Sequence, residues 1–302
     1  MRRLTIYILV LFSTLSPLAA QELDPRRWSH LPINTNFFGG AYAYTEGDIS
    51  FDPALLIEDA EVRLDTVAFA YIRTFSLYGK TARLDVVQAW RDARWSGKLD
   101  GVKTTVNRQG LADTRLRFSV NLFGAPPLSG KDYARYRAAT EVETIVGVAL
   151  NVDLPTGQYK KDKLLNIGNN RFTVSPQLGV VHKRGNWTFE GTTTVDFYTD
   201  NNSFFNGKKR EQDPFFTMQA HAIYDLSPGS WVSASLGYGN GGRSTIDGVR
   251  KNDKKEFVAW ALSAGYPITK RLSLKAAYIG TRRQRDSGLE SDTFTIGFST
   301  FW

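Results

Sequence analysis

Cysteine is absent from this sequence of 302 residues, and histidine occurs only three times, as His30, His182 and His221. The absence of cysteine excludes disulfides, thiolate metal sites and cysteine nucleophiles. By strand phase we expect His182 on an outward face near a short turn, and His221 on an inward face at mid-strand, where no serine motif couples it to a nucleophile. Metal-ligand spacings and phosphate-binding glycine loops are missing too. We therefore predict no enzyme activity, no cofactor and no metal site, and keep catalysis at the outer rim as a third alternative.

Long apolar runs are also missing beyond residue 20. A membrane-spanning helix needs roughly 20 apolar residues in succession, and no such stretch is present. The mean hydropathy of −0.31 is typical of a soluble protein. This value does not exclude a membrane protein, because a barrel strand presents only every second residue to lipid.

The first twenty residues have the pattern of a secretory signal peptide. Arg2 and Arg3 are followed by an apolar run over residues 4–12 and by the small residues Ala19 and Ala20. This pattern predicts export and cleavage near Ala20. The alternative is a retained anchor helix, which the interruption of the run after residue 12 disfavours. Residues 21–35 then form an N-terminal segment that is periplasmic or lumenal and can act as a plug, and residues 36–302 form the folded domain.

From Asn36 onward the chain repeats segments of about eleven residues in which apolar and polar side chains alternate, a period typical of β-strands. Between residues 188 and 198, for example, Phe189, Val195 and Phe197 alternate with Glu190 and Asp196. The predicted strands are residues 36–46, 62–74, 81–92, 111–123, 141–153, 171–183, 187–198, 215–226, 231–239, 256–266, 271–280 and 291–302. The pattern alone also fits a water-soluble sandwich.

The lengths of the connections separate the two folds. Long connections at 47–61, 93–110, 154–170, 199–214, 240–255 and 281–290 alternate with mostly short ones at 75–80, 184–186, 227–230 and 267–270. Bacterial outer-membrane barrels have an even strand number, short periplasmic turns and longer extracellular loops. We therefore predict an all-β protein, a closed antiparallel transmembrane β-barrel of about twelve strands. The long connection 124–140 breaks the pattern, and indicates either a small surface excursion or an error in the strand count.

The last strand ends on an aromatic residue. Gly297 and, five residues later, Trp302 resemble the C-terminal insertion signal of outer-membrane barrels, although Thr300 stands where an apolar residue is usual. Aromatic residues near other strand ends are typical of interfacial girdles, or of sandwich core packing: Tyr42, Tyr44, Trp90, Trp231, Tyr238, Tyr266 and Tyr278.

Charged residues within the strands are expected on the inward face, because an Arg or Lys facing lipid at mid-membrane costs about 2–4 kcal/mol. Three consecutive strands are richest in them: Arg83 and Asp85, then Asp113, Arg115 and Arg117, then Glu141 and Glu143. We favour a structural ion-pair network, and keep a charge-selective constriction as the functional alternative. Phe69 and Tyr71 share a face with charged residues, so either they line the lumen or a bulge reverses the strand's phase.

Basic runs lie in the predicted outer loops: residues 160–163, 208–210, 250–255 and 282–285. On an outer surface we expect their counterpart to be the phosphate-rich lipopolysaccharide layer and not nucleic acid. Ordinary solvated loops, or a funnel for anionic solutes, are the alternatives.

Several short motifs, in a fixed order along nearly the whole mature chain, resemble the transporter family named for the meta-pathway of phenol degradation. They are Asn36 with residues 42–44 and 47–48, residues 73–75 with 79–80 and 84–86, Gly110 with Asp113, Arg115 and Arg117, residues 124–126 and 154–159, and residues 166–168 with 170–171. The resemblance implies an outer-membrane protein of a Gram-negative bacterium, a channel for uptake of aromatic or other hydrophobic compounds. It carries over no binding residues.

Together these features predict an outer-membrane channel for passive uptake of small organic solutes. Its expected partners are outer-membrane lipids, lipopolysaccharide, the barrel-insertion machinery and the solute. The alternative is a non-transporting barrel that binds lipopolysaccharide or a partner through its basic loops.

Overall fold

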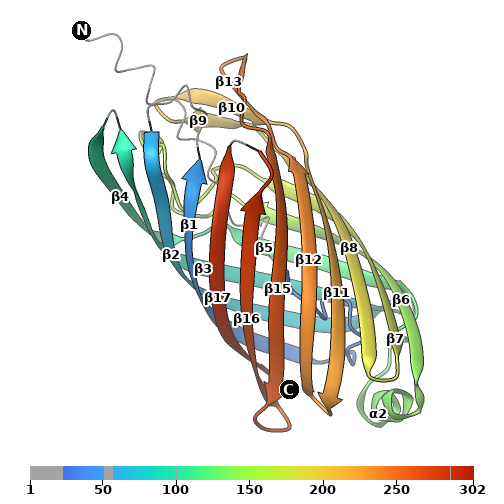
Figure 1. Ribbon diagram of the computed structural model, residues 1–302. Coiled ribbons are helices and arrows are strands. Elements are labelled where there is room, and N and C mark those ends of the chain that lie inside the picture. Colours follow the sequence, from blue (N-terminus) through green and yellow to red (C-terminus); the bar gives the residue numbers. More distant parts are fainter. Residues whose placement is uncertain (1–22, 51–56, 100, 286) are drawn as a thin grey trace.

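The computed structural model describes residues 23–50, 57–99, 101–285 and 287–302, and the predicted signal peptide, residues 1–20, lies outside them. The described residues form one closed antiparallel sheet with a smaller sheet at one end (Figure 1). In chain order the large sheet contains β1 (Asn36–Ser50), β2 (Ile57–Leu77), β3 (Lys80–Leu99), β4 (Val102–Leu111), β5 (Thr114–Phe123), β6 (Val142–Leu154), β7 (Thr173–Arg184), β8 (Trp187–Tyr198), β11 (Phe215–Ser227), β12 (Ser230–Gly241), β15 (Lys255–Pro267), β16 (Leu272–Arg283) and β17 (Gly288–Phe301).

The ring closes with twelve barrel positions. Neighbours follow the order β2-β1-β17-β16-β15-β12-β11-β8-β7-β6-β5-β3, and β2 also pairs with β3. β4 and β5 share one position, because β4 pairs with residues 90–99 of β3 and β5 with residues 82–87. The predicted closed antiparallel barrel of about twelve strands is confirmed.

The predicted long connection 93–110 is wrong. Residues 93–99 continue β3, residues 102–111 form β4, and the two strands pair as a hairpin. Gly101 lies in the turn with a φ of 77°, a conformation that glycine adopts without steric cost. These strands extend past the length of about 9–11 residues that crosses a membrane, so the boundaries expected from that length were too short.

The two ends of the barrel differ. One end, here called the turn end, carries short connections such as Tyr78-Gly79 between β2 and β3. The other end, the loop end, carries the small sheet (Figure 1), in the order β14-β13-β10-β9. Its strands are β9 (Asn201–Phe204), β10 (Lys208–Gln212), β13 (Ser244–Ile246) and β14 (Val249–Arg250). The predicted long loops 199–214 and 240–255 therefore pair with each other, through β10 and β13.

The irregular connection 124–140 is a surface excursion, and the strand count is correct there. It contains α2 (Gly130–Ala139), a short helix at the turn end with no buried residue (Figure 1). Tyr133 ties the helix to the N-terminal segment that precedes β1, because its hydroxyl donates to the His30 carbonyl at 2.8 Å. Within the described part of the chain, no helix is both long and apolar enough to cross a membrane.

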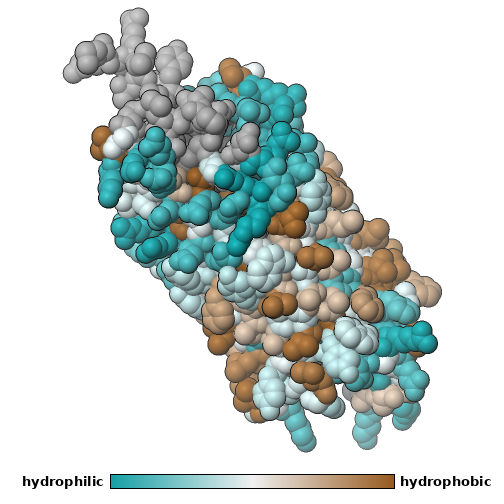
Figure 2. Space-filling model, in the orientation of Figure 1, coloured by the Kyte–Doolittle hydropathy of each residue, from teal (hydrophilic) through white to brown (hydrophobic). Residues whose placement is uncertain are grey.

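The two faces of the barrel wall have opposite character. Large apolar side chains such as Leu236, Leu262 and Ile296 are exposed on the outer face, whereas serine, threonine and charged side chains on the inner face are buried. Figure 2 shows apolar surface around the lower part of the barrel and hydrophilic surface at the loop end. This reversed distribution is expected when lipid surrounds the wall.

The predicted girdle is present in part. On the outer face, the hydroxyls of Tyr42, Tyr238 and Tyr278 donate to the carboxylates of Asp65, Glu256 and Asp292, which lie on neighbouring strands. The prediction that Trp231 belongs to this girdle is wrong, because Trp231 faces inward and the Arg26 guanidinium lies 5.1 Å from its ring centroid.

Phe69 and Tyr71 do not line the lumen, and no bulge reverses the strand there. Phe69 is 51% exposed and stacks on Phe38 of the neighbouring strand, on the outer surface. Arg63 shares this face, yet lies towards the loop end of the 21-residue strand β2, beyond the apolar band. A strand longer than the membrane carries charges on its lipid-facing side at its ends, which explains the mixed pattern in the sequence.

Candidate functional site in the barrel lumen

Residues 23–35 lie inside the barrel, most of them in its turn-end half, with Leu23 reaching Phe215 and Phe257 towards the loop end, and we call them the N-terminal plug. The plug bonds to inward-facing side chains around the ring. Lys275 of β16 pairs with Asp24, Asp225 of β11 pairs with Arg26, and the Arg27 backbone N–H donates to Glu190 of β8 at 3.1 Å. Arg83 of β3 donates to the Arg27 carbonyl at 3.2 Å. A segment with partners on four strands around the ring must occupy the lumen.

Trp28 is the apolar anchor of the plug. It is 2% exposed, and its indole N–H donates to the Thr192 hydroxyl at 2.9 Å. The ring packs against Gly147 and Gly179, where any side chain would overlap it. On the neighbouring wall, the Arg117 guanidinium lies 4.7 Å from the ring centroid. The barrel wall is therefore shaped to hold an indole ring at this depth.

A second contact holds the plug near the turn end. His30 is buried, with Nδ1 3.2 Å from a Glu143 oxygen and Nε2 2.8 Å from the Pro126 carbonyl oxygen. The Arg137 guanidinium of α2 donates to the other Glu143 oxygen at 2.6 Å. The excursion between β5 and β6 thus supplies a cation that compensates the buried carboxylate.

Most of the residues predicted for the charged inward face do lie there, and they form pairs. Arg83 donates to Asp85 at 2.8 Å, and Asp85 also lies 3.6 Å from Arg117. Arg115 donates to Asp153 of the next strand at 2.6 Å.

The remaining predicted charges have other surroundings. The Asp113 carboxylate accepts backbone N–H groups of Gly157 and Asn169, from the loop that precedes β7. Glu141 precedes β6 at the turn end and is exposed. Glu143 pairs with Arg137 of α2 and lies against His30 of the plug, so these partners come from outside the three charged strands.

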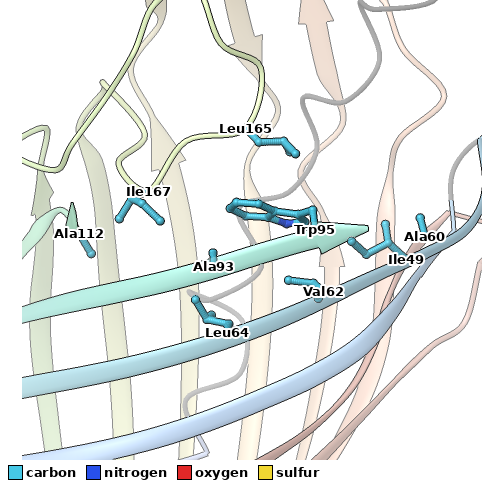
Figure 3. Packing of buried hydrophobic residues seen from close by; sticks show 9 residues of the cluster. All are labelled: Ile49, Ala60, Val62, Leu64, Ala93, Trp95, Ala112, Leu165 and Ile167. Atoms are coloured by element: carbon cyan, nitrogen blue, oxygen red, sulfur yellow. The ribbon is translucent and has the colours of Figure 1, made fainter. Parts of the chain in front are cut away.

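The loop end of the lumen is narrowed by apolar packing. Leu165 and Ile167, from the loop between β6 and β7, pack on inward side chains of β2 and β3 that include Leu64 and Trp95 (Figure 3). The inner face of β2 and β3 is therefore apolar near the loop end, whereas the inner face of the strands across the lumen is polar. Sequence alternation could not show this, because the covering loop is distant in the chain.

The opposite wall carries small polar side chains. Ser233 of β12 and Ser263 of β15 lie opposite each other in the register, and Thr281 of β16 lies nearer the loop end, opposite Ala259. All three are buried, and within the described residues none of their hydroxyl oxygens has a hydrogen-bond partner. Nε2 of His221 on β11 is also without a partner there, while Nδ1 lies 2.8 Å from the Ser235 hydroxyl. His182 is exposed on the outer face, as predicted.

The lumen residues offer no coordination site. Over the described ranges, no three histidine or carboxylate side chains gather closely enough to hold a metal ion. The chemistry available at the wall is hydrogen bonding and charge pairing.

A closed twelve-stranded antiparallel barrel with an apolar outer band and a polar inner wall defines the class of transmembrane β-barrel proteins. Within that class the chain belongs to the family described as "Putative MetA-pathway of phenol degradation", whose model matches residues 40–296. The predicted family resemblance is confirmed.

Solved structures support the same fold. An outer membrane channel from Pseudomonas putida F1 is similar at a TM-score of 0.77 and 20% identity, over 93% of this chain and 100% of that chain. The translocator domain of the autotransporter NalP from Neisseria meningitidis matches at a TM-score of 0.50 and 12% identity, over 90% of each chain. The transport unit of the autotransporter AIDA-I from Escherichia coli matches at 0.50 and 9% identity, over 96% of this chain and 95% of that one. Identities this low establish the fold alone. No curated protein sequence matches the chain.

Proposed function

We propose that this protein is an outer-membrane channel of a Gram-negative bacterium that admits small organic solutes by passive diffusion. The family description names a phenol degradation pathway, and a structure similar to this one at a TM-score of 0.77 is called an outer membrane channel. The turn end then faces the periplasm and the loop end faces outward.

The observation that carries the proposal is the polar inner face of the barrel wall, where small hydroxyl side chains such as Ser233, Ser235 and Ser263 point inward. Serine and threonine hydroxyls can both donate and accept hydrogen bonds. A wall of this kind suits a path for water and for solutes with a polar group, whereas an apolar interior would not. Eight strands give an interior that side chains just fill, and a ring of twelve is wider. Small hydroxyl side chains fill less of that extra width than large side chains would.

The N-terminal plug sets the size of the path. Its contacts include one tryptophan and several ion pairs across the lumen, so the plug narrows the turn-end half to solutes that pass beside it. A narrow path lined by hydroxyls on one side and by apolar side chains near the loop end suits small solutes with a polar group and an apolar body. Phenolic compounds have this character.

Flux into liposomes tests the proposal. Purified protein in sealed vesicles is compared with empty vesicles for entry of phenol, benzyl alcohol, glycerol and a disaccharide. We expect faster entry of the small aromatic probes and exclusion of the disaccharide. Because phenol crosses bare lipid, glycerol is the probe with a low background. Entry rates equal to those of empty vesicles for every probe would refute the channel.

The alternative is a non-transporting barrel that binds lipopolysaccharide or a partner through basic loops. Its support is weaker, because many of the loop cations are already paired with acidic side chains. The pairs are Lys163–Asp162, Lys209–Asp200, Arg250–Asp213, Arg282–Asp292, Arg283–Glu290 and Arg285–Glu256. Unchanged vesicle permeability together with salt-sensitive lipopolysaccharide binding would favour this alternative.

A further inference from the structure

Two buried arginines meet at the loop end of the lumen, beside the small sheet. Arg171 precedes β7, and Arg210 lies on β10. They are 4% and 7% exposed. Nη2 of each donates to the same acceptor, the amide oxygen of Gln212, at 3.2 Å in the case of Arg210. Two guanidinium groups that share one neutral oxygen stand close together in a dry environment.

Neither guanidinium has an acidic partner among the residues that the structure describes. No ion pair involves Arg171 or Arg210, and Nη1 of Arg171 and Nε of Arg210 are buried without a hydrogen-bond partner there. The contacts that remain are with aromatic rings: Arg171 lies 4.3 Å from the Tyr198 centroid and Arg210 lies 5.7 Å from that of Phe204.

The acidic groups that act on these arginines electrostatically are Asp113, Asp200 and Asp253. Each of them already has other donors. Asp113 accepts the backbone N–H groups of Gly157 and Asn169, Asp200 pairs with Lys209 at 2.8 Å, and Asp253 accepts the backbone N–H and the hydroxyl of Ser244. Lys255, at the start of β15, adds a third positive charge within electrostatic range of both arginines. The cluster therefore carries excess positive charge.

Such a cluster is costly unless an anion joins it, because buried charges persist when they are paired. Burial, together with the charge of Arg210, lowers the pKa of Arg171 to about 9. The group still stays protonated at neutral pH, so the charge is not removed by titration. Two guanidinium groups that meet at one oxygen, each with a nitrogen still without a partner, match the two oxygens of a carboxylate.

We propose that Arg171 and Arg210 form a binding site for the carboxylate of a small organic anion. The aromatic rings of Tyr198 and Phe204 lie beside the two guanidinium groups, and such surroundings suit a carboxylate attached to an apolar or aromatic body. This inference rests on the proposed channel function and adds its substrate class: the solute is captured at the loop end before it passes the plug. Because the donors are buried, a bulky lipopolysaccharide headgroup does not fit the site as well as a small acid does.

Equilibrium binding of benzoate to the purified protein in detergent tests the site. Benzyl alcohol has the same ring without the charge, and inorganic phosphate is an anion without the ring. We expect calorimetry to detect benzoate, with weaker binding of both comparison ligands. Arg171→Gln and Arg210→Gln should each lower benzoate affinity roughly 10- to 100-fold, the range for hydrogen bonds to charged groups. Arg250→Gln is the matched control, because Arg250 is exposed on the same small sheet and pairs with Asp213.

A second measurement separates this site from a purely structural pair. Without benzoate, Arg171→Gln should unfold at the same temperature as the native protein or higher, since it removes like-charge repulsion. Lowered stability with unchanged benzoate affinity would overturn the proposal. So would equal binding of benzoate and benzyl alcohol, phosphate binding as tight as that of benzoate, or no binding at all. Benzoate binding without flux of any probe would keep the site and refute the channel, whereas flux without benzoate binding would do the reverse.

Discussion

Replacing Trp28 with alanine should release the N-terminal plug while leaving the barrel folded. The indole ring is 2% exposed, donates to Thr192 and lies under the Arg117 guanidinium. Truncation of a buried tryptophan to alanine costs about 3–5 kcal/mol. Since each 1.4 kcal/mol is a factor of ten, the ratio of docked to undocked plug should fall by roughly two to three and a half powers of ten. The barrel strands keep all their ladder hydrogen bonds, so the cost falls on docking.

Conductance across planar lipid bilayers measures this effect. The native protein should show small, steady conductance, and Trp28→Ala should show larger and longer-lived openings. Trp187→Ala is the matched control, because Trp187 is half-exposed on the outer face, where it stacks on Phe189. If Trp28→Ala inserts, keeps the heat-dependent gel mobility of a folded barrel and conducts like the native protein, the plug is not the barrier.

Three further predictions test the packing of Trp28 against the wall, the facing of side chains on β15, and the closure of the barrel. Gly179→Ala places a methyl group where Trp28 lies and should open the channel as Trp28→Ala does, whereas Gly191→Ala, with no atom closer than 3.9 Å to the new carbon, should conduct normally. Equal conductance of the two glycine variants would contradict the packing of Trp28 against Gly179. Leu262→Lys should cost about 2–4 kcal/mol in the free energy of unfolding, since the residue faces lipid on β15, whereas Ser263→Lys should cost less because it faces the lumen; urea titrations in lipid vesicles compare them, and the reverse order would mean a shifted register. Finally, the unheated protein should migrate faster on a detergent gel than the boiled protein, and identical mobility would speak against a closed barrel.

Strand positions could be predicted from the sequence because the wall contacts two different media. Alternation over 187–198 matches β8 at both ends, and the 142–154 and 215–227 strands differ from prediction by one residue. Alternation predicted the facing of side chains wrongly where strands extend beyond the membrane. Arg63 and Phe69 share the outward face of β2, and this is possible because the strand has 21 residues, so that Arg63 lies outside the apolar band.

The charged residues that the barrel wall contributes to the candidate site could be predicted from the sequence, whereas the contacts of the N-terminal plug could not. Arg83, Asp85 and Arg117 could be placed on the inner face by their phase. The ring that Arg117 covers belongs to Trp28, 89 positions earlier in a segment without periodicity. No pattern in a single sequence links a tryptophan to the two glycines that make room for it. The Arg171–Arg210 pair was missed for a similar reason. Arg171 was predicted to begin a strand and Arg210 to lie in an outer loop, and their burial depends on pairing between distant loops.

The seam of the barrel has a consequence for the order of assembly. β1 pairs with β17 from Phe37 opposite Phe301 to Ser50 opposite Gly288, and the backbone N–H of Asn36 donates to the Trp302 carbonyl at 3.0 Å. The ring therefore stays open until β17 is available, which is after every other strand has been synthesised. The plug immediately precedes β1 and reaches partners on β3, β8, β11 and β16. Its residues can gather these strands around themselves while the seam is still open, so the segment that later narrows the path can first serve as a template on which the wall is assembled.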